Sequence, residues 1–437
     1  MTSTEAQPEG ERPRRLQPFA SFRYRNYRWL WAANVCFALV DASLRFSFVW
    51  LFIETLDRGP TFIGLSLALF SLPGLLVTLP AGVWADRKDR RLLLITSHVA
   101  VALALLLTVV LGLTESELVL LPTFLAGIGL AIGAPVRAAL VPALVPANRL
   151  MNGNAVNALG LALGAVAGPA VAGVAINQWG VEGSFVVLAA FMGLGALFLV
   201  PLRVPPRESL PSTPESEGTR SGMWGAIGEG FGFIFSGTTV VGSLFLLLLV
   251  TALASPWLAL NYVNLLNSVD TDAGMARALL GLMGAASLAS LFVIASIARL
   301  RNAGGWYAAM VGAGALLTVA ISSSSSVGVT ALLMVPYGLV GGISGIVFLT
   351  LVQSATPITL MGRVMAMQSL VLALGAAVGG LAAAVDTEAM RHEAGVIAAG
   401  VVVVVAAVAV VVRNPGLRRM PSHPEEPVAP PAEPDSG

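Results

Sequence analysis

The sequence contains very little cysteine, histidine or charge. Its 437 residues include one cysteine, three histidines and 11% charged residues. A single cysteine, Cys36, cannot form an intramolecular disulfide, and the three histidines lie too far apart to show the spacing of a metal site. We therefore expect no metal site and no cofactor.

The scarcity of charge also excludes an ordinary soluble domain. Hydrophobic residues make up 56% of the chain and the mean hydropathy is +0.82, values typical of a polytopic protein of the lipid bilayer. The net charge of +1 gives no reason to expect a nucleic-acid partner. The sequence shows neither a nucleophile paired with a base nor a phosphate-binding loop, so we do not expect an enzyme.

Long apolar runs predict twelve membrane-spanning helices. A helix needs about 20 apolar residues to cross a bilayer, and such runs form two sets of six, in residues 29–202 and 236–413. The predicted spans are 29–55, 62–85, 92–113, 118–145, 150–177, 183–202, 236–265, 275–299, 305–321, 327–354, 358–385 and 394–412. The predicted fold is an all-α membrane protein with two pseudo-symmetric six-helix bundles.

Polar segments flank the two predicted bundles. Residues 1–28 are polar and rich in arginine, 203–235 form a linker that starts with many Pro, Ser and Glu residues, and 414–437 are dominated by Pro and Glu. We expect a short interfacial helix at 223–235. The chain start and 414–437 are expected to be disordered, because they cannot bury apolar surface.

Arginine and lysine are concentrated in alternate loops, together with both terminal segments. The remaining loops carry mainly Asp and Glu, with Arg58, Arg277 and Arg391 as exceptions. Since positively charged loops remain in the cytoplasm, we expect both termini to be cytoplasmic.

The two halves resemble each other. Residues 140–168 align with 351–379 at a constant offset of 211, with one matched proline pair and two matched glycine pairs. These pairs are Pro146 with Pro357, Gly164 with Gly375 and Gly168 with Gly379. The pattern predicts a duplicated fold. Chance similarity between apolar sequences is the alternative, and the matched prolines and glycines argue against it.

Few charged residues lie inside the predicted spans, and three of them are far from a span end. Asp41 and Arg45 belong to the first span, and Arg137 belongs to the fourth. A charge near the bilayer centre costs about 2.5–3.5 kcal/mol on insertion scales, so it needs a partner or a wet cavity. Asn34, Asp41 and Arg45 share one helix face, which is expected to look into the bundle, where Arg137 is in reach.

Two roles for Asp41 fit this pattern. It either titrates the coupled proton, held ionised by Arg45 or Arg137, or forms an ion pair that only orients the first helix. Two arginines and one acid also make the cavity positive, which favours a neutral or anionic amphiphile. Candidate cavity residues, for which ordinary helix packing is the alternative, are Asn34, Trp257, Asn261, Tyr262, Asn264, Tyr337 and Gln353.

A dense charged cluster separates the second and third spans. The pattern Gly82-x-x-x-Asp86-Arg87-x-x-Arg90-Arg91 resembles motif A, a loop signature of the major facilitator superfamily. We expect the Asp86 carboxylate at the positive end of a helix that starts after Thr356-Pro357. The resemblance implies that this contact latches the two halves in the outward-open state, with Gly82 permitting close approach. Asp89, where the family usually has glycine, is expected to compete. Alternatively, the cluster serves topology alone.

A glycine stripe in the fifth span resembles the antiporter motif of the superfamily's exporters. It consists of Gly160, Gly164, Gly168, Pro169 and Gly173. Glycines four residues apart clear one helix face for close packing, and the proline bends the helix. Generic helix packing is the alternative.

Two further segments of the sequence narrow the resemblance to one group of exporters within the superfamily. The segment 134–142 and the pattern Asn152-x-Asn154-x-x-Asn157 are similar to bacterial exporters that include the enterobactin exporter and macrolide-efflux proteins. This resemblance implies a monomeric, proton-coupled exporter of small molecules in the bacterial inner membrane. Thr123 stands where drug/proton antiporters often carry arginine, which puts the usual proton route in doubt. The alternatives are an importer or facilitator on the same scaffold, or a non-transporting sensor or scaffold.

Overall fold

The computed structural model describes residues 18–51, 60–204, 222–237, 239–268, 273–296, 300–324, 326–389 and 392–422, and this part of the chain is helical throughout apart from its turns. The α-helices are α1 (Arg25–Trp50), α2 (Pro60–Arg87), α3 (Arg90–Val110), α4 (Leu120–Leu144), α5 (Leu150–Leu199), α6 (Met223–Gly232), α7 (Thr239–Ser268), α8 (Ala273–Ser296), α9 (Ala303–Ser322), α10 (Val327–Ala355), α11 (Met361–Ala389), α12 (His392–Arg413) and α13 (Pro415–Arg419).

The long helix α5 contains two predicted spans. Its 50 residues are interrupted at Gly180, whose φ of 71° only glycine adopts readily, so the chain turns back there. The two arms, 150–179 and 181–199, together with α1–α4 and α7–α12, make up the twelve membrane-spanning helices. On length and hydropathy alone, six described segments qualify as spans, and one of them is the 53-residue Ala147–Leu199.

The helices form two bundles with the same internal order. In the N-terminal bundle, α2 packs on α4, α4 on α3, α3 on α5, and α5 on α1. In the C-terminal bundle, α8 packs on α10, α10 on α9, α9 on α12, α12 on α7, and α7 on α11. Each N-terminal helix therefore has a counterpart in the C-terminal bundle, and the predicted pseudo-symmetric fold is confirmed.

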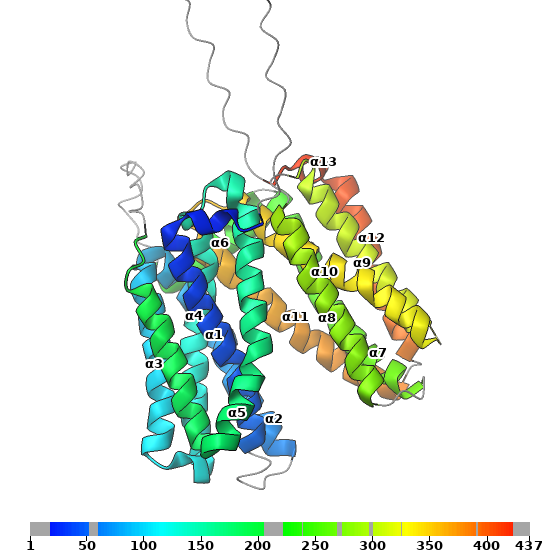
Figure 1. The fold of residues 1–437 in the computed structure, drawn as a ribbon. Helices are drawn as coiled ribbons and strands as arrows, with labels where there is room; N and C mark the ends of the chain where they lie inside the picture. Colours follow the sequence, from blue (N-terminus) through cyan, green and yellow to red (C-terminus); the bar gives the residue numbers. More distant parts are fainter. Residues whose placement is uncertain are drawn as a thin grey trace, which may run out of the picture.

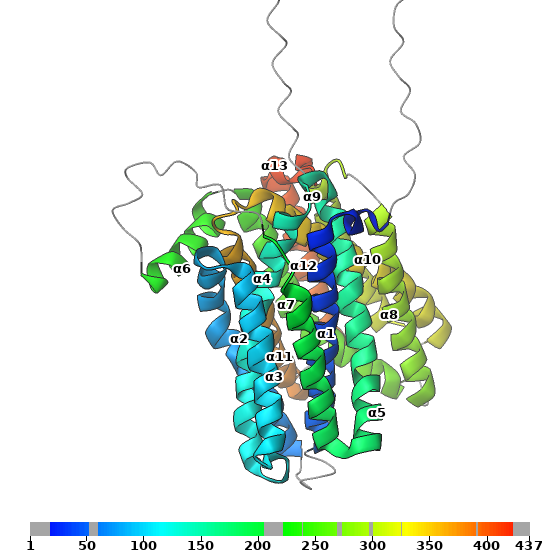
Figure 2. The same ribbon diagram turned by 60° about the vertical axis from the view of Figure 1, so that its left-hand side comes forward.

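The start of α1 and the end of α13 lie at one end of the molecule, which we call the terminal end (Figure 1). The two bundles are close together at this end and diverge away from it (Figure 1). The predicted short helix after the linker is α6, which lies beside α2 at the same end (Figure 2). Most of the predicted linker falls in 205–221, which lies outside the described residues.

The prediction of disorder after residue 413 is wrong for its first part. Helix α13 begins at Pro415, and Leu417 is fully buried against Gly304 at the start of α9. The backbone N–H of Ser422 also donates to the carbonyl of Leu300, at 3.1 Å. The single leucine in this proline-rich stretch thus supplies enough apolar contact to fold it, while 423–437 lie outside the described residues.

Three glycines of α5 bring it into close contact with α1. A Cβ atom at Gly164 would lie 2.7 Å from the backbone of Val35 and Leu39, and one at Gly168 would lie 2.6 Å from the Leu39 carbonyl oxygen. At Gly160, a Cβ would lie 2.5 Å from the Trp31 indole nitrogen. Gly173 was predicted in the same stripe, but nothing lies within 4 Å of its Cβ position, because α5 has turned this position away from α1.

We predict opposite effects of alanine at Gly164 and Gly173. The methyl group of Gly164→Ala meets backbone atoms that cannot move independently, and such overpacking costs about 1–3 kcal/mol. The same change at Gly173 enters open space and raises helix propensity. Thermal unfolding in detergent should therefore give a lower Tm for Gly164→Ala and an equal or higher Tm for Gly173→Ala. Equal losses in both variants would contradict the close packing of α5 on α1.

Candidate functional site

One contact between the bundles is made by Asp86 at the end of α2. Its Oδ1 accepts a hydrogen bond from the backbone N–H of Gly362, at 2.7 Å, and its Oδ2 accepts one from that of Arg363, at 3.1 Å. These N–H groups belong to the first turn of α11, which has no acceptor for them within the helix. Asp86 of one bundle therefore caps a helix of the other.

The predicted helix start after Thr356-Pro357 is displaced. Thr356 follows the last residue of α10 and its hydroxyl donates to the Val352 carbonyl, at 2.6 Å. Residues 357–360 form a turn, and α11 begins at Met361. The N-terminus of α11 is capped by Asp86 from the other bundle, so no local threonine–proline cap is needed.

Glycines on both α2 and α11 allow Asp86 to reach the start of α11. A Cβ at Gly82 would lie 2.6 Å from the Cβ of Ala366 and 2.7 Å from the carbonyl oxygen of Gly362. A Cβ at Gly362 would collide with the carbonyl oxygen of Gly82 and lie 2.8 Å from Oδ1 of Asp86. The two backbones touch directly, which brings the α11 N–H groups within reach of the short aspartate side chain.

The buried side chain of Arg90 stabilises the same contact between α2 and α11. Only 4% of it is exposed, and its guanidinium donates to the carbonyls of Ala85 and Ala139, both at 2.9 Å, and of Ile358, at 3.2 Å. It also lies 3.4 Å from Oδ1 of Asp86. Arg90 thereby joins α2, α4 and the turn before α11.

The other residues of the charged cluster have separate partners. Arg91 donates to the carbonyls of Leu199 and Val200, at the end of α5, and Arg87 is exposed. Asp89 accepts from the N–H groups of Arg91, at 2.8 Å, and Leu92, at 3.4 Å. Asp89 was expected to compete with Asp86, but its carboxylate is held as the N-cap of α3, since that helix starts one residue later.

Arg363 connects the junction to α6. Its side chain lies 3.5 Å from Oδ2 of Asp86 and also pairs with Glu229 of α6. Neither Glu229 nor the interfacial helix was assigned a role from the sequence. A glutamate on a short amphipathic helix gave no signal that distinguished it from an ordinary solvated residue.

A second junction joins the start of α5 to α8 and α10. The Asn152 amide donates to the Ala295 carbonyl, at 2.6 Å, and accepts from the Ser21 N–H, at 2.9 Å. The Asn154 amide donates to Oε1 of Gln353, at 2.7 Å, and to the Thr350 hydroxyl, at 3.0 Å. Since α5 and α8 are the counterparts of α11 and α2, the two junctions are related by the pseudo-symmetry.

Two predicted cavity residues are instead buried in helix contacts. Gln353 is 3% exposed, and besides Asn154 it binds the Ala138 carbonyl of the other bundle, at 2.9 Å. Asn34 is 1% exposed and donates to Oδ1 of Asn157, at 2.7 Å. The prediction that they line a cavity is therefore wrong in this conformation. The repeated asparagines at 152, 154 and 157 were the signal for these contacts, but the sequence did not reveal their partners.

The structure brings Asp41 and Arg45 together on α1. Their side chains are 3.2 Å apart and are 30% and 49% exposed, respectively. Arg137 is only 8% exposed, and its guanidinium lies 3.3 Å from the centre of the Phe37 ring. Such stacking on an aromatic face stabilises a desolvated cation. The three charges are therefore split between an accessible pair and a cation inside the N-terminal bundle.

His98 of α3 was missed by the sequence analysis. It is fully buried, and its Nδ1 lies 2.8 Å from the Leu94 carbonyl oxygen. Among the described residues, its Nε2 and one terminal nitrogen of Arg137 have no hydrogen-bond partner. Buried polar atoms without a hydrogen-bond partner are uncommon in folded proteins. A lone histidine within an apolar run gave no hint of this environment.

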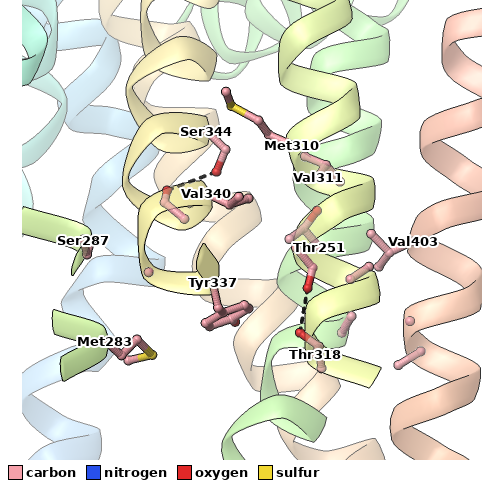
Figure 3. Close-up of a pocket in the computed structure, with 17 residues that line it drawn as sticks. Thr251, Met283, Ser287, Met310, Val311, Thr318, Tyr337, Val340, Ser344 and Val403 are labelled. Carbon is pink, nitrogen blue, oxygen red and sulfur yellow. Dashed lines mark hydrogen bonds between the residues drawn. The ribbon is translucent and has the colours of Figure 1, made fainter. Parts of the chain in front are cut away.

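The remaining predicted positions have mixed outcomes. Thr123 is buried and its hydroxyl donates to the Val119 carbonyl of the preceding turn, at 2.7 Å. Tyr337 lines a cavity inside the C-terminal bundle (Figure 3). The residues predicted on α7 belong to that helix, but their side chains lie outside the described residues; they are Trp257, Asn261, Tyr262 and Asn264.

Comparison with known proteins supports the fold assignment. A family model described as Major Facilitator Superfamily matches residues 30–380. Solved structures of several transporters resemble the chain. The human organic anion transporter MFSD10 (TETRAN) has a TM-score of 0.70 and 14% identity, over 90% of this chain and 99% of its own. E. coli FucP in the outward conformation has a TM-score of 0.68 and 13% identity, over 89% of this chain and 98% of its own. The proton:xylose symporter XylE has a TM-score of 0.61 and 14% identity, over 89% of this chain and 95% of its own. No curated protein matches the sequence.

We predict that Asp86→Asn loosens the terminal end. An amide offers one acceptor oxygen where the carboxylate offers two, so one N–H of α11 is left unsatisfied, at a cost of about 1–3 kcal/mol. In a Cys36→Ser background, spin labels at Asn148→Cys and Arg301→Cys, both exposed and on different bundles, should report a larger population of long distances. Asp89→Asn is the control, because Asp89 only caps α3. An unchanged distance distribution in Asp86→Asn would contradict the assignment.

Proposed function

The chain belongs to the major facilitator superfamily of membrane transporters, and we propose that it is a secondary active exporter that moves amphipathic small molecules by proton antiport with alternating access. The observation that carries this proposal is the close contact of α5 with α1 through Gly160, Gly164 and Gly168. It joins the glycine stripe resembling the exporters' motif to the helix that holds Asp41. A Cβ at Gly168 would lie 3.0 Å from the Cβ of Ala42, the residue that follows Asp41 in α1.

The terminal junctions support alternating access. The bundles are joined there by a few hydrogen bonds: the Asp86 carboxylate accepts from N–H groups of the other bundle, and the Asn152 and Asn154 amides donate to oxygens of it. Such a bond contributes about 0.5–1.5 kcal/mol net between neutral groups and about 1.5–3 kcal/mol where one group is charged, so the junctions can separate without unfolding either bundle. We place the terminal end and both termini in the cytoplasm of a bacterium, so that these junctions close the inner-membrane transporter toward the cytoplasm.

Asp41 is the proposed proton-titrating group. Its side chain is 30% exposed and lies 3.2 Å from the Arg45 guanidinium. Binding of a substrate that draws Arg45 away would release the carboxylate to take up a proton. The alternative role, an ion pair that only orients α1, rests on the same contact and is separated from this one by experiment.

The charge balance favours a neutral or anionic substrate. Arg45 and Arg137 outnumber Asp41 in the membrane-embedded part of the N-terminal bundle, so a cation is disfavoured there. The similarity to an organic anion transporter is consistent with this choice. We propose a siderophore-like or drug-like molecule, as in the exporter subfamily that the sequence resembles, and a monomeric protein.

Import is the second candidate. It is favoured by the similarity of the fold to FucP and XylE, which are both described as proton symporters. The glycine stripe on α5 argues against it, because that motif is typical of the superfamily's exporters.

We expect energised everted membrane vesicles to accumulate neutral and anionic amphiphiles, and an uncoupler of the proton gradient to abolish the accumulation. A panel of anionic, neutral and cationic compounds, measured against vesicles from cells without the protein, gives both direction and charge preference. Accumulation in right-side-out vesicles instead would establish import. A preference for organic cations would contradict the charge argument.

Two variants separate the roles of Asp41. Asp41→Asn removes the titratable group, whereas Arg45→Gln breaks the pair and keeps the group. For a proton role, Asp41→Asn should abolish uncoupler-sensitive transport, while Arg45→Gln should retain it with a shifted pH profile, because loss of a nearby cation makes a carboxyl easier to protonate. Equal losses in both variants with no change in pH profile would show that the pair is only structural.

A further inference from the structure

The C-terminal bundle contains a partly open cavity of about 260 Å³. It is lined by residues of α7, α8, α9, α10 and α12, and Figure 3 shows Tyr337 of α10 pointing into it between Met283 and Thr318. Because α9 and α12 contribute to its wall and no described residue of the N-terminal bundle does, the cavity lies within one bundle and is distinct from the interface between the two halves.

Small residues create this space. Nothing lies within 4 Å of a Cβ built on Gly341, and at Gly314 the nearest atom is 3.6 Å away. Helices α4 and α10 end at Leu144 and Ala355, so the offset of 211 holds for this pair. The counterpart of Gly341 is therefore Leu130, which is 6% exposed and packs in the core of the N-terminal bundle. The space at this position is filled by a leucine side chain in the N-terminal bundle and is left open in the C-terminal bundle.

The described residues of the wall are apolar apart from a few hydroxyl groups, and none of them is charged. The Thr318 hydroxyl donates to the Gly314 carbonyl, at 2.9 Å, and the Ser344 hydroxyl donates to that of Gly341, at 3.0 Å. The Thr251 hydroxyl likewise donates to the Leu247 carbonyl, at 2.6 Å. Since these protons are already committed, the oxygens offer acceptor lone pairs to a ligand, although the Thr318 hydroxyl also interacts with that of Tyr337.

We propose that this cavity binds an uncharged, hydrocarbon-rich molecule that carries a hydroxyl group. An apolar cavity of about 150 Å³ already accepts benzene, so this larger one accommodates a longer chain or a second ring. An ionised ligand is excluded, because the wall supplies no counter-charge to offset its desolvation. Gly341 is exposed, so the cavity is not sealed. The ligand comes either from solution or from the bilayer as a lipid alcohol.

The test uses a diazirine derivative of octanol as a photoactivatable probe. The full-length protein, purified in lipid-free detergent, is irradiated with the probe and the adducts are mapped by mass spectrometry. Wild-type protein should be labelled at Met283 and Met310, which line the cavity. Gly341→Leu, which puts an isobutyl group into the space, should lower this labelling about tenfold by steric exclusion.

Gly345→Leu is the matched control. Gly345 lies one turn further along α10, also has nothing within 4 Å of its Cβ position, and does not line the cavity. Its labelling should stay at the wild-type level. Equal labelling in Gly341→Leu and wild type would overturn the proposal, as would wild-type adducts confined to lipid-facing residues.

Thr318→Val keeps the shape of the wall and removes one acceptor, so it tests the hydroxyl preference even if Gly341→Leu does not fold. Octanol should compete with the probe several-fold better than octane for wild-type protein, and this difference should shrink in Thr318→Val. No preference in wild type would contradict the hydroxyl assignment.

Labelling that persists in lipid nanodiscs supports a ligand from solution, and labelling lost only there supports a lipid alcohol. No transport is measured, so the result does not depend on the proposed direction of transport.

Discussion

The closed terminal end depends on the hydrogen bonds that the Asp86 carboxylate accepts from the start of α11. Asp86 lies on α2 and accepts two N–H groups of α11, so one side chain satisfies donors that the helix cannot satisfy internally. A negative charge at a helix N-terminus gains about 0.3–1 kcal/mol at an exposed site and up to about 2 kcal/mol when partly buried. That energy is large enough to favour one arrangement and small enough to reverse.

Close backbone contact makes this interaction possible. Aspartate has a short side chain, and it reaches α11 only because Gly82 and Gly362 let the two backbones touch. The asparagine contacts of α5 with α8 and α10 form the pseudo-symmetric counterpart, and they use neutral amides. The fold therefore repeats, while the described contacts of the two junctions differ in chemistry, with a carboxylate in one and neutral amides in the other.

The interiors of the two bundles differ in a similar way. The N-terminal bundle contains Arg137 stacked on Phe37 and the buried His98. At the offset of 211, the position of Arg137 corresponds to Phe348, which packs against Phe245 and Tyr307 in the C-terminal bundle. The C-terminal bundle instead leaves a cavity where its counterpart has Leu130. Duplication supplied a common scaffold, in which one half carries buried charge and the other carries apolar space.

The sequence by itself determined the number of spans, the two-bundle plan and the glycines at which helices approach closely. These properties depend on hydropathy and residue size, which act locally along the chain in a bilayer. Only the tertiary structure decided the partners: Asp89 caps α3, Gln353 binds Asn154, Arg137 stacks on Phe37 and Leu417 folds the start of the tail. A polar side chain binds whichever group packing brings within about 3 Å, and residues that are distant in sequence become neighbours only when the bundles assemble.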